Sequence, residues 1–145
     1  MNSDNKKVTA ELILEAIGRP GEYLTETLNK IIEEIGKEPG VKITNSRVNE
    51  PVLLKDQKDF YTNFAEVEVE ADEVLRIAIL MFKYMPAHIE IISPQNLNLR
   101  NCDIDDLFNE IARRLHGYEE ITRIAQTEKE ILEKKLNSLL EKEKK

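Results

Sequence analysis

Two polar residues on one expected strand could take part in chemistry. His88 and Glu90 alternate with Ile89 and Ile91, so both polar side chains lie on the same face of that strand. A histidine beside a carboxylate can act in acid–base catalysis, or bind a metal where further ligands join it. The same pattern is typical of solvent-facing residues on a half-buried strand. An enzyme that uses His88 and Glu90 therefore ranks lowest among the functions considered.

A second candidate site is the turn Gly18-Arg19-Pro20-Gly21, which joins an expected strand to the start of an expected helix. Free backbone amides, the helix dipole and the Arg19 guanidinium could together bind a carboxylate or a phosphate there. Arg19 and Gly21 are therefore the candidate ligand-binding residues, for an anionic metabolite. A tight turn with Pro20 near the first helical position explains the same residues without a ligand.

The remaining reactive and acidic residues have simpler explanations. Cys102 is the only cysteine, which excludes an internal disulfide and a cysteine-rich zinc site, and we expect it to be partly buried. Asp103, Asp105 and Asp106 lack the spacing and the glycine of a calcium loop, and they fit the cap and first turn of a helix. No catalytic set is recognisable, and neither a metal nor a cofactor is expected.

The charge of the chain argues against nucleic acid and membrane surfaces as partners. Asp and Glu number 28 against 21 Lys and Arg, which gives a formal net charge of -7. Basic residues concentrate only at Arg113, Arg114, His116 and Arg123, where interspersed glutamates favour ion pairs along a helix. The single cysteine and an N-terminus without a signal-peptide pattern predict a cytoplasmic protein. The most apolar run, residues 74–85, is too short to span a bilayer.

Strand and helix patterns alternate along the first two thirds of the chain. Polar and apolar residues alternate in the expected strands, and apolar residues recur at helical spacing in the expected helices. The strands are residues 8–17, 41–48, 61–71 and 89–93, and the helices are residues 24–36 and 74–85, the second capped by Asp72. This order predicts an α+β fold, a ferredoxin-like βαββαβ domain with two helices on one face of an antiparallel sheet. The domain should cover residues 8–95, after a disordered N-terminus over residues 1–7.

A long amphipathic helix is expected over residues 101–140, capped by Asp103 and followed by a charged tail over residues 141–145. Apolar residues repeat in it at seven-residue intervals, as in a coiled coil, although Gly117 could introduce a bend. A straight helix of that length spans about 55 Å at about 1.5 Å per residue, so a small domain cannot cover its distal half. The expected interaction surface consists of Tyr118, Ile124, Ala125, Ile131, Leu132, Leu136 and Leu139.

Three segments of the chain carry a resemblance to a known family. They are Ala16-Ile17-Gly18-Arg19-Pro20, the strand from Phe64 to Glu70, and Tyr84-Met85-Pro86-Ala87-His88-Ile89-Glu90-Ile91-Ile92-Ser93-Pro94. With these segments the chain is similar to a family of small archaeal proteins of unknown function. The resemblance implies an archaeal origin and brings no activity, cofactor or site residue with it.

These observations favour a non-enzymatic protein-interaction module. We expect a homo-oligomer assembled through the C-terminal helix, the open sheet face or both, with a protein partner as a further possibility. The alternative is a domain that senses an anionic metabolite near Arg19, whose architecture resembles amino-acid-sensing ACT domains. That likeness is one of fold alone, and a fold does not fix a function.

Overall fold

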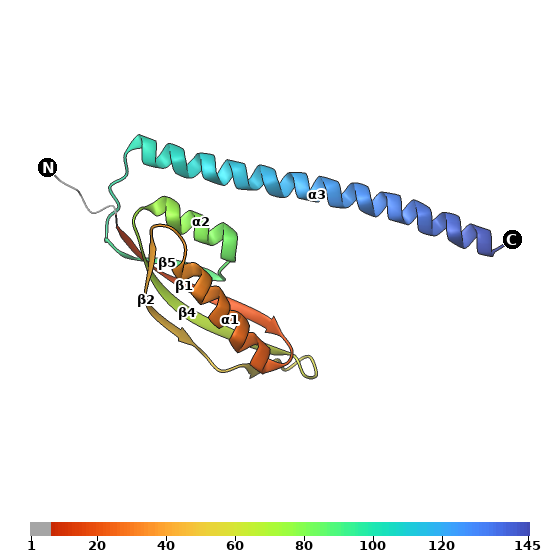
Figure 1. The fold of residues 1–145 in the computed structure, drawn as a ribbon, viewed down its shortest axis with the longest axis horizontal. Helices are drawn as coiled ribbons and strands as arrows, with labels where there is room; N and C mark the ends of the chain where they lie inside the picture. The colour runs from red at the N-terminus through yellow and green to blue at the C-terminus, as the bar shows by residue number, and fades with distance from the viewer. Residues whose placement is uncertain (1–6) are drawn as a thin grey trace. The chain divides into compact units, whose positions relative to one another are not determined.

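The computed structural model describes residues 7–145, which fall into two compact units, one ending at Leu107 and the other running from Phe108 to Lys145. The first unit is an antiparallel sheet with two helices (Figure 1). Its elements are β1 (Val8–Gly18), α1 (Gly21–Gly36), β2 (Val41–Val48), β3 (Val52–Leu53), β4 (Tyr61–Ala71), α2 (Val74–Tyr84) and β5 (His88–Ser93). The helix α3 (Asn101–Glu143) begins in this unit and forms most of the second.

The sheet has the order β2-β4-β1-β5, and the short β3 also pairs with β4. All pairings are antiparallel. The longest pairing joins β1 to β4, from Val8 opposite Ala71 to Gly18 opposite Tyr61. Chain neighbours β1 and β2 are therefore separated by β4. The helix α1 makes the connection between them.

Both helices of the first unit pack on one face of the sheet. Alternate residues of β1 and β4 are buried on this face, which follows from the two-residue period of a strand. They form a single core with the inward side chains of α1 and α2. The fully buried large members of this core include Leu12, Leu28, Ile35, Val67 and Leu80.

The structure corrects the caps that the sequence suggests for two helices. Helix α2 starts at Val74 as expected, but Glu73 and not Asp72 is its N-cap, without a side-chain cap hydrogen bond. Helix α3 begins at Asn101, ahead of Asp103, whose carboxylate accepts a 2.9 Å hydrogen bond from the backbone N–H of Arg100. The first residues of the expected charged tail are helical, as far as Glu143. The expected disordered N-terminus lies outside the described residues except for Lys7, which pairs with Glu70.

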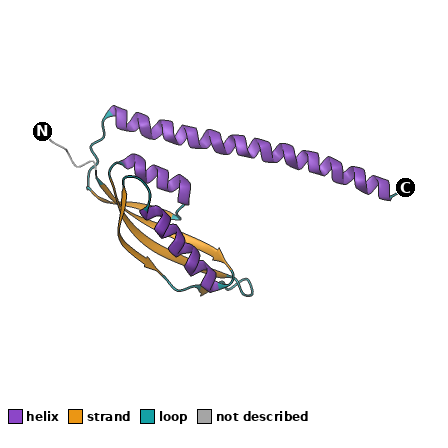
Figure 2. Cartoon of the chain, in the orientation of Figure 1, coloured by secondary structure: helices purple, strands orange, loops and turns teal. Residues whose placement is uncertain are grey.

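Helix α3 is unbroken over its 43 residues, including the turn at Gly117 (Figure 2). A glycine lowers the helix propensity at its own position but does not break a helix, because strong helix formers on both sides compensate for it. No residue of α3 is buried. Across the described residues, none of the helices combines the length and the hydropathy that crossing a lipid bilayer would require.

Candidate functional site

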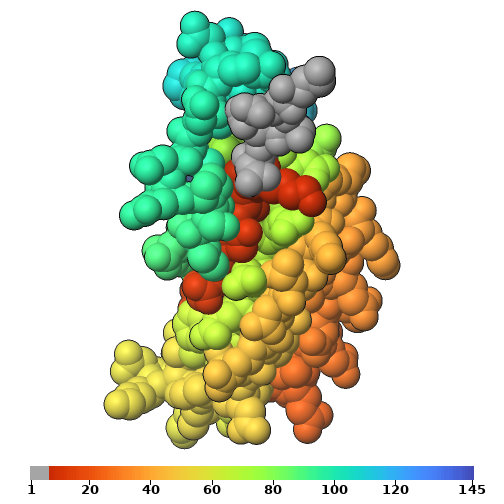
Figure 3. All heavy atoms as spheres, turned by 90° about the vertical axis from the view of Figure 1, so that its left-hand side faces the viewer, coloured from red at the N-terminus to blue at the C-terminus, as the bar shows by residue number. Residues whose placement is uncertain are grey.

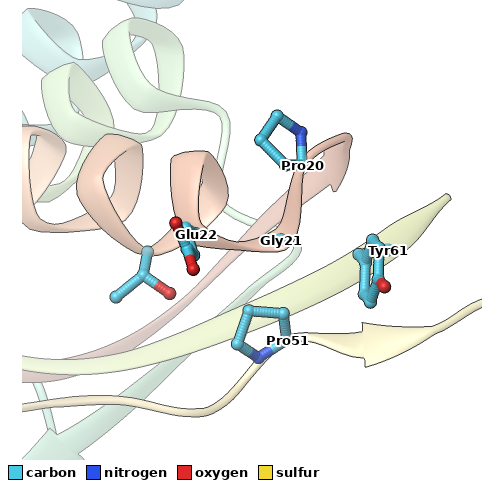
Figure 4. Close-up of a pocket in the computed structure, with 6 residues that line it drawn as sticks. Pro20, Gly21, Glu22, Pro51 and Tyr61 are labelled. Carbon is cyan, nitrogen blue, oxygen red and sulfur yellow. The ribbon is translucent and has the colours of Figure 1, made fainter. Parts of the chain in front are cut away.

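The turn that holds Arg19 and Gly21 borders a shallow hollow of about 480 Å³ at the start of α1. Gly21 lines it, and an added Cβ there would lie 3.0 Å from the Cβ of Pro51, so the loop before β3 approaches the helix closely. The hollow is drawn in Figure 4, where Pro51 and Tyr61 face the turn formed by Pro20 and Gly21. The structure therefore places one of the two candidate ligand-binding residues in a cavity wall.

The charges around this hollow do not favour an anion. Glu22 lines it, and its carboxylate would repel a phosphate or a carboxylate. The guanidinium carbon of Arg19 lies 5.8 Å from the centre of the Phe60 ring, in a cation–π contact, and Arg19 is not among the residues that line the hollow. Arg19 and Gly21 are close in the chain but do not converge on one space.

One buried polar group lies near the same hollow. Asn63 is 1% exposed and donates a 3.2 Å hydrogen bond from Nδ2 to Oγ1 of Thr25, which lines the hollow. The Oδ1 atom of Asn63 has no hydrogen-bond partner among the described residues. Sequence reasoning missed this residue because asparagine is polar. The signal was present, since Asn63 has the same parity in β4 as the buried Ala65 and Val67.

The histidines and the cysteine are not assembled into a reactive cluster. His88 lies opposite Ile13 on β5, while His116 belongs to the second unit, 3.8 Å from a carboxylate oxygen of Glu119. Cys102 is exposed, so the expectation that it is partly buried was wrong; the start of α3 leaves it uncovered. Over residues 7–145, no group of three or more His, Cys, Asp or Glu side chains is placed to hold a metal ion.

The arginines of α3 are occupied by ion pairs within the helix. Arg113 and Arg114 both donate to Glu110, at 2.7 Å and 2.8 Å. The hydrogen bonds from Arg113 and then Arg114 hold the pKa of Glu110 below its usual range. Arg123 approaches Glu119 at 3.3 Å nine residues further along the helix. The spacing of three and four residues thus converts this basic concentration into a set of local pairs.

Carboxylates line up across three strands on the sheet face opposite the helices. Glu11 of β1 lies directly opposite Glu68 of β4 on one side and Glu90 of β5 on the other. Figure 3 shows part of this side of the first unit, where the red atoms of β1 are visible beside the yellow-green atoms of β4. Glu66, Glu68 and Glu70 alternate along residues 61–71 in the sequence, but only the strand register brings glutamates of three strands into one row.

A row of exposed apolar side chains runs along α3. From Tyr118 to the C-terminus every residue is exposed. The large apolar side chains of this segment are between 43% and 65% exposed, the values of Tyr118 and Ile121. We call the following set the apolar stripe: Tyr118, Ile121, Ile124, Ala125, Ile131, Leu132, Leu136, Leu139 and Leu140. It contains all seven residues expected from the sequence to form an interaction surface.

A comparison with protein families assigns the chain. The model of the MJ0538 family matches residues 9–137, which span the sheet, both its helices and most of α3. No curated protein and no solved structure matches the chain. The match confirms the family resemblance expected from three segments of the sequence. The chain belongs to the MJ0538 family.

Proposed function

We propose that this protein is a non-enzymatic assembly module whose C-terminal helix associates with a second copy of the chain. The observation that carries the proposal is the exposed apolar stripe. Leu132, Leu136 and Leu139 are 64%, 57% and 61% exposed, on a helix of a unit that contains no other element of its own. An aliphatic side chain contributes about 1.5–3 kcal/mol when it is transferred fully from water into an apolar contact. A continuous row of such residues is typical of protein–protein contacts.

The remainder of the proposal concerns setting and fold. We assign the first unit to the ferredoxin-like class, supported by the separation of β1 from β2 by β4 and by two helices on one face. A cytoplasmic location in an archaeal cell is the setting that the single exposed cysteine and the family resemblance support. The sensing of an anionic metabolite stays a prediction, tested by a thermal shift with phosphate that Arg19→Ala abolishes.

Light scattering of the full chain across a range of concentrations tests the assembly proposal. A chain shortened to end at Gly117, before the apolar stripe, is the comparison. The full chain should show a molar mass that rises to at least twice that of one copy, and the shortened chain should remain a single copy. A full chain that stays a single copy at hundreds of micromolar would overturn the proposal.

A further inference from the structure

Two opposite charges lie inside the apolar stripe rather than beside it. Residues three and four positions away are neighbours on a helix surface. For Glu128 these neighbours are Ile124, Ala125, Ile131 and Leu132, all of them members of the stripe. Its carboxylate therefore projects from the middle of an apolar face.

Lys135 has the same kind of surroundings one heptad further along. Its neighbours at three and four positions are Ile131, Leu132, Ser138 and Leu139. Every other charged residue from Glu119 to Glu141 has a charged neighbour at such a spacing. In the described part of the chain neither Glu128 nor Lys135 has an ion-pair partner. The two residues are seven positions apart, which is about 10 Å along the helix axis.

Covering the stripe would remove both charges from water, which is strongly unfavourable for an ion without a partner. The partner surface must therefore offer a cation to Glu128 and an anion to Lys135, one heptad apart. The same helix of a second copy supplies that pattern when it runs in the opposite direction. A parallel copy in register would instead place Glu128 against Glu128 and Lys135 against Lys135.

We propose that the apolar stripe pairs with the stripe of a second copy in antiparallel orientation, with Glu128 of each copy against Lys135 of the other. This inference rests on the proposed assembly function and adds its direction and register. A buried polar pair that selects one register is an established role for charged residues in helical assemblies.

The register that joins the charges also matches the apolar residues. Ile131 then lies at the level of Leu132 of the second copy, and Ile124 at the level of Leu139. Ala125, the smallest member of the stripe, lies at the level of Ser138, so the two helices can approach closely there. A shallow hollow lined by Lys134, Lys135, Ser138 and Leu139 lies at this level. Two-fold symmetry repeats each contact, as an isologous interface requires.

Charge reversal in the full chain tests the orientation. Glu128→Lys sets two ammonium groups against each other at this contact, and Lys135→Glu sets two carboxylates against each other. Each single change should therefore weaken dimerisation at least about ten-fold in low salt. The double variant restores opposite charges and should return the dissociation constant to within about three-fold of the original. Glu130→Lys is the matched control, because it makes the same charge change outside the stripe and gains Glu133 as a favourable neighbour in place of Lys134.

Disulfide mapping gives a second measurement that does not depend on affinity. In a Cys102→Ala background, chains carrying Ala125→Cys and chains carrying Ser138→Cys should form mixed disulfides when combined under a redox buffer. Ala125→Cys alone should not link to itself, because the two copies of residue 125 lie about 20 Å apart along the antiparallel pair.

The outcomes separate the two proposals. If the full chain dimerises but the double reversal does not rescue it, or if Ala125→Cys links to itself, the antiparallel register is overturned and the assembly function stands. If the full chain never leaves the single-copy state, both are overturned.

Discussion

The hydroxyl of Tyr84 donates a 2.6 Å hydrogen bond to Oε1 of Glu38, which joins the end of α2 to the turn after α1. Lys83 donates to the same carboxylate oxygen. Tyr84 and Glu38 are 46 positions apart, so this bond closes the helix layer of the first unit at one end. It follows that Tyr84 stabilises the position of α2 on the sheet.

Replacing Tyr84 by Phe should lower the free energy of unfolding by about 1.5 kcal/mol, because a hydrogen bond to a charged group is lost. Urea unfolding monitored by circular dichroism measures the change. Tyr23→Phe, at a tyrosine of α1 that is 58% exposed, is the control and should leave the unfolding midpoint unaltered. An equal loss in both variants would show that the bond to Glu38 contributes nothing specific.

The same tyrosine predicts a pH dependence. Burial, and then the hydrogen bond to Glu38, raise the pKa of Tyr84 above its ordinary value near 10. A group whose pKa is raised in the folded state stabilises that state fully below its unfolded pKa and loses this contribution as the pH rises toward the folded pKa. The stability difference between the natural chain and Tyr84→Phe should therefore be constant up to about pH 9 and shrink above about pH 10. A difference that grows in alkaline solution would contradict this assignment.

The buried amide of Asn63 predicts a non-additive pair of substitutions. Thr25→Val removes the acceptor at 3.2 Å and leaves a buried amide donor unpaired, which should destabilise the chain by about 1–2 kcal/mol. Adding Asn63→Leu replaces the whole polar pair with apolar groups and should recover most of that loss. Denaturant unfolding of both single variants and the double variant forms the cycle. Strict additivity of the two changes would argue that the two side chains do not interact.

The glutamate row on the sheet predicts a stabilising substitution. Glu11 faces Glu68 and Glu90, and like charges directly opposite each other destabilise a sheet. Glu11→Gln should raise the free energy of unfolding by about 0.5 kcal/mol in low salt, with a smaller gain at about 1 M salt because the repulsion is screened. Glu33→Gln on α1 makes the same chemical change away from the row and should give no such gain. A loss of stability in Glu11→Gln at low salt would show that this carboxylate is favourably paired.

The apolar stripe predicts which face of α3 association depends on. Leu132→Glu places a charge in the stripe and should raise the dissociation constant of the dimer more than about ten-fold, since one leucine is removed from each copy. Asn137→Glu adds the same charge on the opposite side of the helix and should change the dissociation constant little. Sedimentation equilibrium of the two variants measures both dissociation constants. Equal weakening in both variants would mean that the stripe is not the contact.

The order of the elements and most of their boundaries could be predicted from the sequence. The alternation in residues 8–17 and 61–71 and the helical spacing of Leu24, Leu28 and Ile35 are local, and each corresponds to an observed element. The predicted cap of α2 lies one residue too early, because aspartate is a better helix cap than glutamate when only residue types are compared. In the fold, the backbone N–H of Asp72 donates a hydrogen bond to the carbonyl of Gly40, next to the end of β4.

What the sequence determined by itself is the apolar stripe, since the spacing of its residues along one helix is a local property that no other part of the chain needs to supply. Only the tertiary structure decided which residues meet across the sheet. The row formed by Glu11, Glu68 and Glu90, the hydrogen bond from Asn63 to Thr25 and the contact of Arg19 with Phe60 depend on strand register and on segments far apart in the chain. Register is fixed by the packing of the whole core, and a shift of one residue would turn every side chain to the other face.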